Sequence, residues 1–181
     1  MFKKGELVVY PAQGVGMVEK IEEQEIGGVK TQLYVVRILS NNVTLMVPVN
    51  NVKNVGLRPV YNQEQGLAIL DYLQDHSDFT GYTGQNWNRR YREYSEKLQS
   101  SELKDVAYVL KELYLISKNK ELSFGERRLL EQAMSLLSME LSYALNLSQS
   151  EVKKKIEAIF ADVISEDKSL PSQEKSPKNK K

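Results

Sequence analysis

The sequence predicts an α+β protein of two domains, a small bent β-sheet or barrel followed by a compact helical bundle. Residues 1–60 form short β-branched and aromatic runs separated by turn residues. From about residue 64 onward, apolar residues recur at the spacing of amphipathic helices. The chain has 181 residues, 41% of them hydrophobic and 27% charged, so it can bury a core. We expect domains at 1–60 and 61–164 and a disordered tail at 165–181.

Four runs in the first domain predict antiparallel strands, at residues 6–10, 15–21, 32–39 and 43–47. Gly27 and Gly28 lie where a tight hairpin turn needs positive φ angles. Gly14 and Gly16 resemble part of a dinucleotide-binding loop, but the third glycine and the following helix are missing. We therefore interpret them as part of a bent strand or turn.

Capping residues and apolar stripes predict three helices in the second domain. Ser123 with Glu126, and Ser148 with Glu151, match the capping box that satisfies free amide groups at a helix start. The stripes around them share one helical period and can share one core. They comprise Leu103, Val106, Ala107, Leu110, Leu113 and Tyr114; Leu130, Met134, Leu137, Leu141 and Leu145; and Val152, Ile156, Ile159, Phe160 and Val163.

The composition excludes several function classes. The chain has no Cys and one His, which leaves no disulfide, no thiolate nucleophile and little for a metal site. No pair of carboxylates, and no nucleophile beside a base, supports catalysis, so we expect no enzyme, cofactor, metal or small-molecule substrate. No apolar run reaches the roughly 18 residues of a membrane span, and the start lacks a signal peptide. The cytoplasm is the expected location.

Residues 85–98 are the one candidate for chemistry, and two interpretations of them remain open. They hold the only Trp, Trp87, on a predicted helix that Asn86 can cap. Trp87, Tyr91, Tyr94 and Leu98 share one face, which favours a core position for the indole. A Trp in a first turn, beside arginines and free amide groups, also suits contact with nucleic acid. The formal net charge is +1, so any such binding must be local and weak by itself.

Five segments together resemble the CarD/CdnL family of bacterial transcription regulators. The resemblance covers about residues 2–164, in the order and with the spacing of that family. The segments are Gly5-Glu-Leu-Val-Val-Tyr-Pro-Ala-Gln-Gly-Val-Gly16, Val47-Pro48, Val55-Gly56-Leu57-Arg58, Asn86-Trp87-Asn88-Arg89-Arg90-Tyr91 and Leu122-Ser-Phe-Gly-Glu-Arg127. A domain similar to the first part also occurs in transcription-repair coupling factors.

The resemblance implies a Tudor-like N-terminal domain that binds the RNA polymerase β subunit and a helical domain that touches promoter DNA. Trp87 would wedge into the minor groove at the upstream edge of the transcription bubble, near the −10 element. An aromatic wedge opposes reclosure of the melted duplex and would stabilise the open complex. The protein would then be associated with the nucleoid through the polymerase. The expected DNA-binding residues are Asn86, Trp87, Arg89, Arg90, Arg92 and Lys97.

The expected docking edge for the polymerase is the strand at 43–47, because an exposed sheet edge can pair with a partner strand. The expected contact residues are Gln24, Val43, Thr44, Leu45, Met46, Val47 and Pro48. Family members carry basic residues near this edge, whereas Gln24 and Met46 stand at the aligned positions here.

Two other functions remain open. In a protein-interaction adaptor, Trp87 would belong to the core and the bundle would bind another protein. An enzyme would require a bound cofactor or metal, for which the sequence gives no support.

Overall fold

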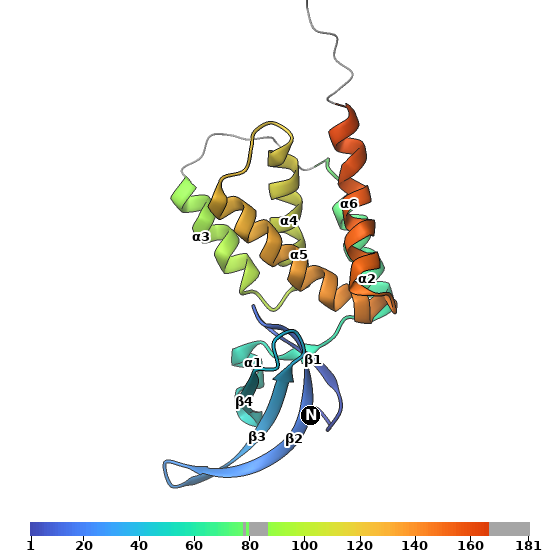
Figure 1. Ribbon diagram of the computed structural model, residues 1–181. Coiled ribbons are helices and arrows are strands. Elements are labelled where there is room, and N and C mark those ends of the chain that lie inside the picture. The colour runs from blue at the N-terminus through green and yellow to red at the C-terminus, as the bar shows by residue number, and fades with distance from the viewer. Residues whose placement is uncertain (78, 80–86, 167–181) are drawn as a thin grey trace, which may run out of the picture.

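The computed structural model describes residues 1–77, 79 and 87–166. The β-sheet forms one end of the molecule, and the helices pack together at the other end (Figure 1). The sheet has the order β4-β3-β2-β1-β5, and all neighbouring strands are antiparallel. Its strands are β1 (Leu7–Tyr10), β2 (Gly14–Ile26), β3 (Val29–Ile38), β4 (Thr44–Pro48) and β5 (Arg58–Pro59).

The predicted hairpin between β2 and β3 is confirmed, with φ angles of 60° at Gly27 and 80° at Gly28. Both strands are longer than the sequence predicts, and the hairpin extends away from the helices (Figure 1). The far part of β2, which includes Glu22, Glu23 and Glu25, lies mostly exposed beyond the core. Neither face of a projecting ribbon is buried, so the sequence there loses the alternation that would identify a strand.

Residues from all of the longer strands form the core of the sheet. Gly16 is required there, because a Cβ atom at this position would lie 2.7 Å from Val36 Cγ1. The strand interpretation of Gly14 and Gly16 is thus confirmed. A 3-10 turn, η1 (Val49–Asn51), and a short helix, α1 (Val52–Val55), then lead to β5. The core residues are Val8, Val18, Tyr34, Val36, Ile38, Val47 and Leu57.

Five helices follow within the part of the chain that the structure describes, and the predicted capping boxes at Ser123 and Ser148 are both present. A third capping box, Asn62 with Gln65, begins the first of these helices. The helices are α2 (Gln63–Gln74), α3 (Trp87–Leu98), α4 (Leu103–Ser117), α5 (Phe124–Leu145) and α6 (Gln149–Glu166).

The buried stripe of α5 is broader than predicted. Leu129, Ala133, Leu137 and Leu141 are buried, whereas Leu130, Met134 and Leu145 are partly buried around the same core. The reason is that α5 packs against several elements at once, chiefly α4 on one side and α6 on another, and against β2.

The predicted α+β class is confirmed, with an N-terminal antiparallel sheet and a C-terminal helical region. Within the described residues, no helix is long and apolar enough to cross a membrane. The predicted tail lies outside the described residues, apart from its first two positions at the end of α6.

Candidate nucleic-acid interface

The first turns of α3 and α5 lie side by side and hold Trp87 between them. A Cβ atom at Gly125 would lie 3.1 Å from Trp87 Cζ2, so the indole packs directly on the backbone of α5. Trp87 is half-buried, with part of its surface open to solvent. This end of the helical domain faces away from the sheet (Figure 1).

The remaining residues of α3 anchor the helix and leave its first turn at the surface. Tyr94 and Leu98 are buried in the helical core. Burial raises the pKa of the Tyr94 hydroxyl well above its usual range, so the group stays neutral. Tyr91 was expected on the same apolar face, but its side chain is 47% exposed and tilts against the Trp87 ring at a centroid distance of 5.5 Å. The apolar face of α3 is therefore buried toward the C-terminal end of the helix and becomes exposed toward its N-terminal end.

Glu126 joins α3 to the start of α5. Its carboxylate is 1% exposed and accepts a hydrogen bond from the Ser123 backbone N–H at 3.0 Å. It also pairs with Lys120 Nζ at 3.0 Å and with Arg90 Nη2 at 3.5 Å. Such close cationic and hydrogen-bonding partners offset the cost of burying a carboxylate at this place.

Arg90 consequently faces inward. It is 7% exposed, and its guanidinium carbon lies 5.8 Å from the centre of the Trp87 ring. A cation at this distance is attracted to the aromatic face. The geometry places Arg90 between Glu126 and the indole, where it holds Trp87 in position.

The outer surface of the same end carries apolar and basic side chains that the sequence analysis missed. Phe124 is 71% exposed, and Arg127 and Arg128 are both exposed on the following turn of α5. Positive charges near a helix N-terminus oppose the helix dipole, so the placement of these two arginines is electrostatically unfavourable for α5. An anion bound there would offset that repulsion. The unfavourable placement of these charges was the feature of the sequence that could have identified the two arginines as site residues.

The predicted DNA-binding residues are therefore only partly brought together. Arg89 and Arg92 are exposed on the first two turns of α3, near Trp87. Lys97 lies at the other end of the helix, where it pairs with Asp105 at 3.6 Å and lies 4.6 Å from the Tyr108 ring centre. Ten residues of helix span about 15 Å, so Lys97 is remote from the indole. Asn86 lies outside the described residues.

The predicted polymerase-docking strand, β4, lies at the edge of the sheet. Thr44 and Met46 are exposed, whereas Val47 is buried in the core. The Ile38 N–H donates to the Val43 carbonyl at 2.8 Å, and hydrogen-bonded pairs alternate along an antiparallel ladder. The backbone groups of Thr44 and Met46 therefore point away from β3, toward the open edge.

Gln24 and Met46 lie together near this edge, with Gln24 Nε2 3.8 Å from Met46 Sδ. Gln24 also donates to Glu22 at 2.7 Å. The surroundings hold no excess of positive charge, because Lys20 pairs with Glu22 and Lys30 with Glu23. What this edge offers a partner is backbone hydrogen bonds and apolar surface.

Among the described residues, no group of His, Asp and Glu side chains is arranged to hold a metal ion. The candidate site is thus a surface of arginine and aromatic side chains around one half-buried indole. Such a surface suits a polyanion that also presents flat apolar rings.

Two family models match the chain, and together they cover both domains. The model described as the CarD-like/TRCF RID domain matches residues 2–61, and the model described as the CarD C-terminal domain matches residues 68–157. The division between the two matches falls at the start of α2.

The sequence of a known protein shows the same relationship over most of the chain. YdeB of Bacillus subtilis (strain 168), which is described as a candidate transcription factor, is 29% identical over 153 residues, which are 84% of this chain and 98% of that protein. A solved structure described as "CdnLNt from Myxoccoccus xanthus" is 48% identical over 33% of this chain and 84% of its own, with a TM-score of 0.29. With both of its domains matched, the chain belongs to the CarD/CdnL family and is a transcription regulator of that family.

Proposed function

We propose that the protein binds the RNA polymerase β subunit through residues 1–60 and stabilises the open promoter complex through the Trp87 end of its helical domain. In this proposal the half-buried indole wedges into the minor groove at the upstream edge of the bubble, near the −10 element. The observation that carries the proposal is that Trp87 packs on Gly125 with part of its ring open to solvent, among exposed arginines.

A rigid, partly exposed indole suits a wedge. Insertion of an apolar side chain between base steps costs stacking energy, so it is favoured where the duplex is already melted. Contacts with Gly125, Tyr91 and Arg90 hold the ring in place before DNA arrives, which lowers the entropy lost on binding. The bound indole would then oppose reclosure of the bubble.

The arginines have two different roles in this proposal, contact with phosphates and positioning of the indole. Arg89, Arg92, Arg127 and Arg128 are exposed and can contact phosphates on either side of the indole. Phe124 adds an apolar contact beside them. Arg90 acts as a positioning residue, because its guanidinium faces Glu126 rather than solvent. Lys97 and Asn86 are not needed in this arrangement.

The docking half of the proposal uses β4. The open backbone groups of Thr44 and Met46 can pair with a strand of the β subunit. Backbone pairing does not depend on basic side chains, so Gln24 and Met46 in place of basic residues are compatible with it.

The test is the lifetime of the open complex on a promoter, measured after a competitor is added. Trp87→Ala should shorten the lifetime by about tenfold, toward the value without the protein, because about 1.4 kcal/mol of stacking is lost. Binding to polymerase should be unchanged, since β4 is remote from α3 (Figure 1).

Tyr143→Ala is the matched control, because Tyr143 is an exposed aromatic residue of α5 near its other end. It should leave the lifetime unchanged. An unaltered lifetime with Trp87→Ala would remove the wedge and favour the adaptor function, in which the same surface binds a protein.

A further inference from the structure

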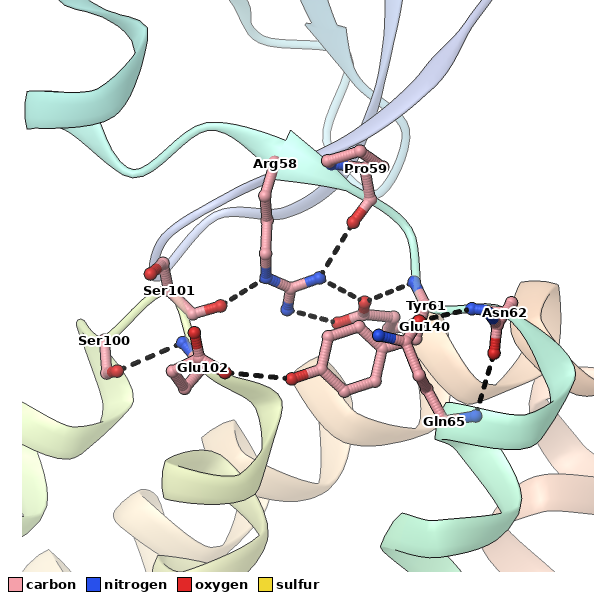
Figure 2. A network of polar contacts seen from close by, with 9 residues as sticks. All are labelled: Arg58, Pro59, Tyr61, Asn62, Gln65, Ser100, Ser101, Glu102 and Glu140. Atoms are coloured by element: carbon pink, nitrogen blue, oxygen red, sulfur yellow. Dashed lines mark hydrogen bonds and ion pairs between the residues drawn. The ribbon is translucent and has the colours of Figure 1, made fainter.

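A buried ion pair links the two domains. Arg58 lies in β5, the last strand of the sheet, and Glu140 lies in α5 (Figure 2). The guanidinium is bidentate, with Nη1 2.6 Å from one carboxylate oxygen and Nη2 2.9 Å from the other. Glu140 is 2% exposed, and the Arg58 side chain is 17% exposed.

The side chains of Arg58 and Glu140 also form hydrogen bonds with the backbone groups around them. Arg58 Nε donates to the Ser101 carbonyl between α3 and α4, and Nη1 donates to the Pro59 carbonyl at 3.0 Å. The Tyr61 backbone N–H donates to the Glu140 carboxylate at 3.0 Å. The centre of the Tyr61 ring lies 4.5 Å from the Arg58 guanidinium carbon. The Tyr61 hydroxyl reaches Glu102 at 3.1 Å (Figure 2).

These contacts join the peptide between the domains to α5 and to the loop before α4. Close backbone approaches surround them, since a Cβ atom at Gly56 would lie 3.1 Å from both Pro11 Cγ and Ser101 Cβ. A Cβ at Gly14 would lie 3.5 Å from Leu136 Cδ2. The two domains are thus fitted together around Arg58 in one arrangement.

Stability alone does not explain an ion pair at this place. A buried ion pair is often no more stabilising than apolar residues of the same volume would be. A bidentate arginine–carboxylate pair does, however, require one relative orientation of its two planar groups. It therefore defines the angle between the elements that carry it more sharply than apolar contacts do.

We propose that Arg58 and Glu140 are positioning residues that set the orientation of the sheet relative to the helical domain, so that β4 and Trp87 can engage their two partners at once. We call this pair the Arg58–Glu140 latch. The inference rests on the proposed function for its consequence at the promoter. The orientation itself is a property of the free protein.

The first experiment measures the orientation directly, by single-molecule energy transfer between two dyes. The chain has no Cys, so Lys53→Cys in α1 and Gln132→Cys in α5 supply the only two thiols, both at exposed positions. The parent should give one narrow distribution of transfer efficiency. Arg58→Lys keeps the charge but loses the bidentate fork, and Glu140→Gln loses the charge, so both should broaden or shift the distribution.

Arg37→Lys is the matched control. Arg37 pairs with Glu19 at 2.6 Å, and both residues lie within the sheet. This variant should give the parent distribution. Thermal melting identifies any variant that fails to fold. If one of the two latch variants fails to fold, the dye distribution of the other one tests whether the pair sets the domain orientation. Parent-like distributions for the folded latch variants would overturn the proposal.

The second experiment measures open-complex lifetime and polymerase affinity for the same variants. The latch variants should bind polymerase as the parent does but lose about tenfold in lifetime, because a loosely oriented domain presents Trp87 at a lower effective concentration. A parent lifetime with a broadened dye distribution would overturn the positioning role. If the parent itself neither binds polymerase nor lengthens the lifetime, the proposed function fails, and the dye distributions still decide whether the latch sets the orientation.

Discussion

Arg89 and Arg90 are neighbours in the chain, yet their guanidinium groups lie in opposite surroundings. Successive side chains on a helix are separated by about 100°, so one can face solvent while the next faces a packed helix. Arg89 is exposed, whereas Arg90 is 7% exposed and pairs with Glu126. The two residues should therefore contribute to DNA binding by different routes.

Substitution of each by Ala separates the two routes. Loss of one phosphate contact with Arg89→Ala should reduce the slope of log binding constant against log salt concentration by about 0.9. Arg90→Ala should leave that slope unchanged and instead lower the free energy of unfolding by about 2 kcal/mol, because a buried cation paired with Glu126 is lost while Lys120 still pairs with Glu126. The measurements are DNA titrations at several ionic strengths and denaturant unfolding.

Arg92→Ala is a second exposed variant for comparison, and it should behave like Arg89→Ala. A reduced salt slope for Arg90→Ala with unchanged stability would contradict the positioning role. Arg90 would then be a direct phosphate contact, as the family resemblance implies.

Among the elements, β4 carries the docking half of the proposal, and its backbone can be tested separately from its side chains. Met46→Pro removes one N–H that points to the open edge and breaks no bond to β3. We expect polymerase binding to weaken about tenfold, the cost of one lost hydrogen bond with its acceptor left unpaired, at little cost in stability. The measurement is binding to purified polymerase.

Met46→Ala is the control, because it shortens the side chain and retains the N–H. It should bind polymerase nearly as the parent does. Equal loss of binding in both variants would show that the side chain of Met46, rather than strand pairing, makes the contact.

Elements with strong local signals could be predicted from the sequence. The hairpin at Gly27 and Gly28 and the capping boxes at Ser123 and Ser148 depend on residues close together in the chain. The full length of β2 could not be predicted, because its projecting half has no buried face to produce alternation. Turn η1 and helix α1 are too short to show a period.

The candidate site was predictable only in part, for a similar reason. Trp87 and its arginines form a compact segment of sequence, so they could be identified together. The indole meets Gly125, one residue after the exposed Phe124, only because α3 packs beside α5, which no local pattern encodes. The pairing of Arg58 with Glu140 joins residues 82 positions apart and depends on the arrangement of whole domains.

At the scale of the whole molecule, the two proposed binding surfaces lie at opposite ends. Strand β4 belongs to the sheet, and the first turn of α3 lies at the far end of the helical domain (Figure 1). A partner that holds one end therefore presents the other at a fixed distance. This separation suits a protein that bridges polymerase and DNA, which are themselves held together in a promoter complex.

Under the proposed function, the charge of the molecule makes such bridging necessary for DNA binding. The formal net charge is +1, and the exposed arginines near Trp87 are Arg89, Arg92, Arg127 and Arg128. Four phosphate contacts give a salt slope of about 3.6, so the protein alone should bind a promoter fragment weakly and lose most of that binding at physiological salt. With polymerase present, the proposed attachment through β4 would raise the effective concentration of the helical domain at one DNA position. Electrophoretic mobility shifts with and without polymerase measure this difference. Nanomolar binding by the protein alone at physiological salt would contradict the bridging account.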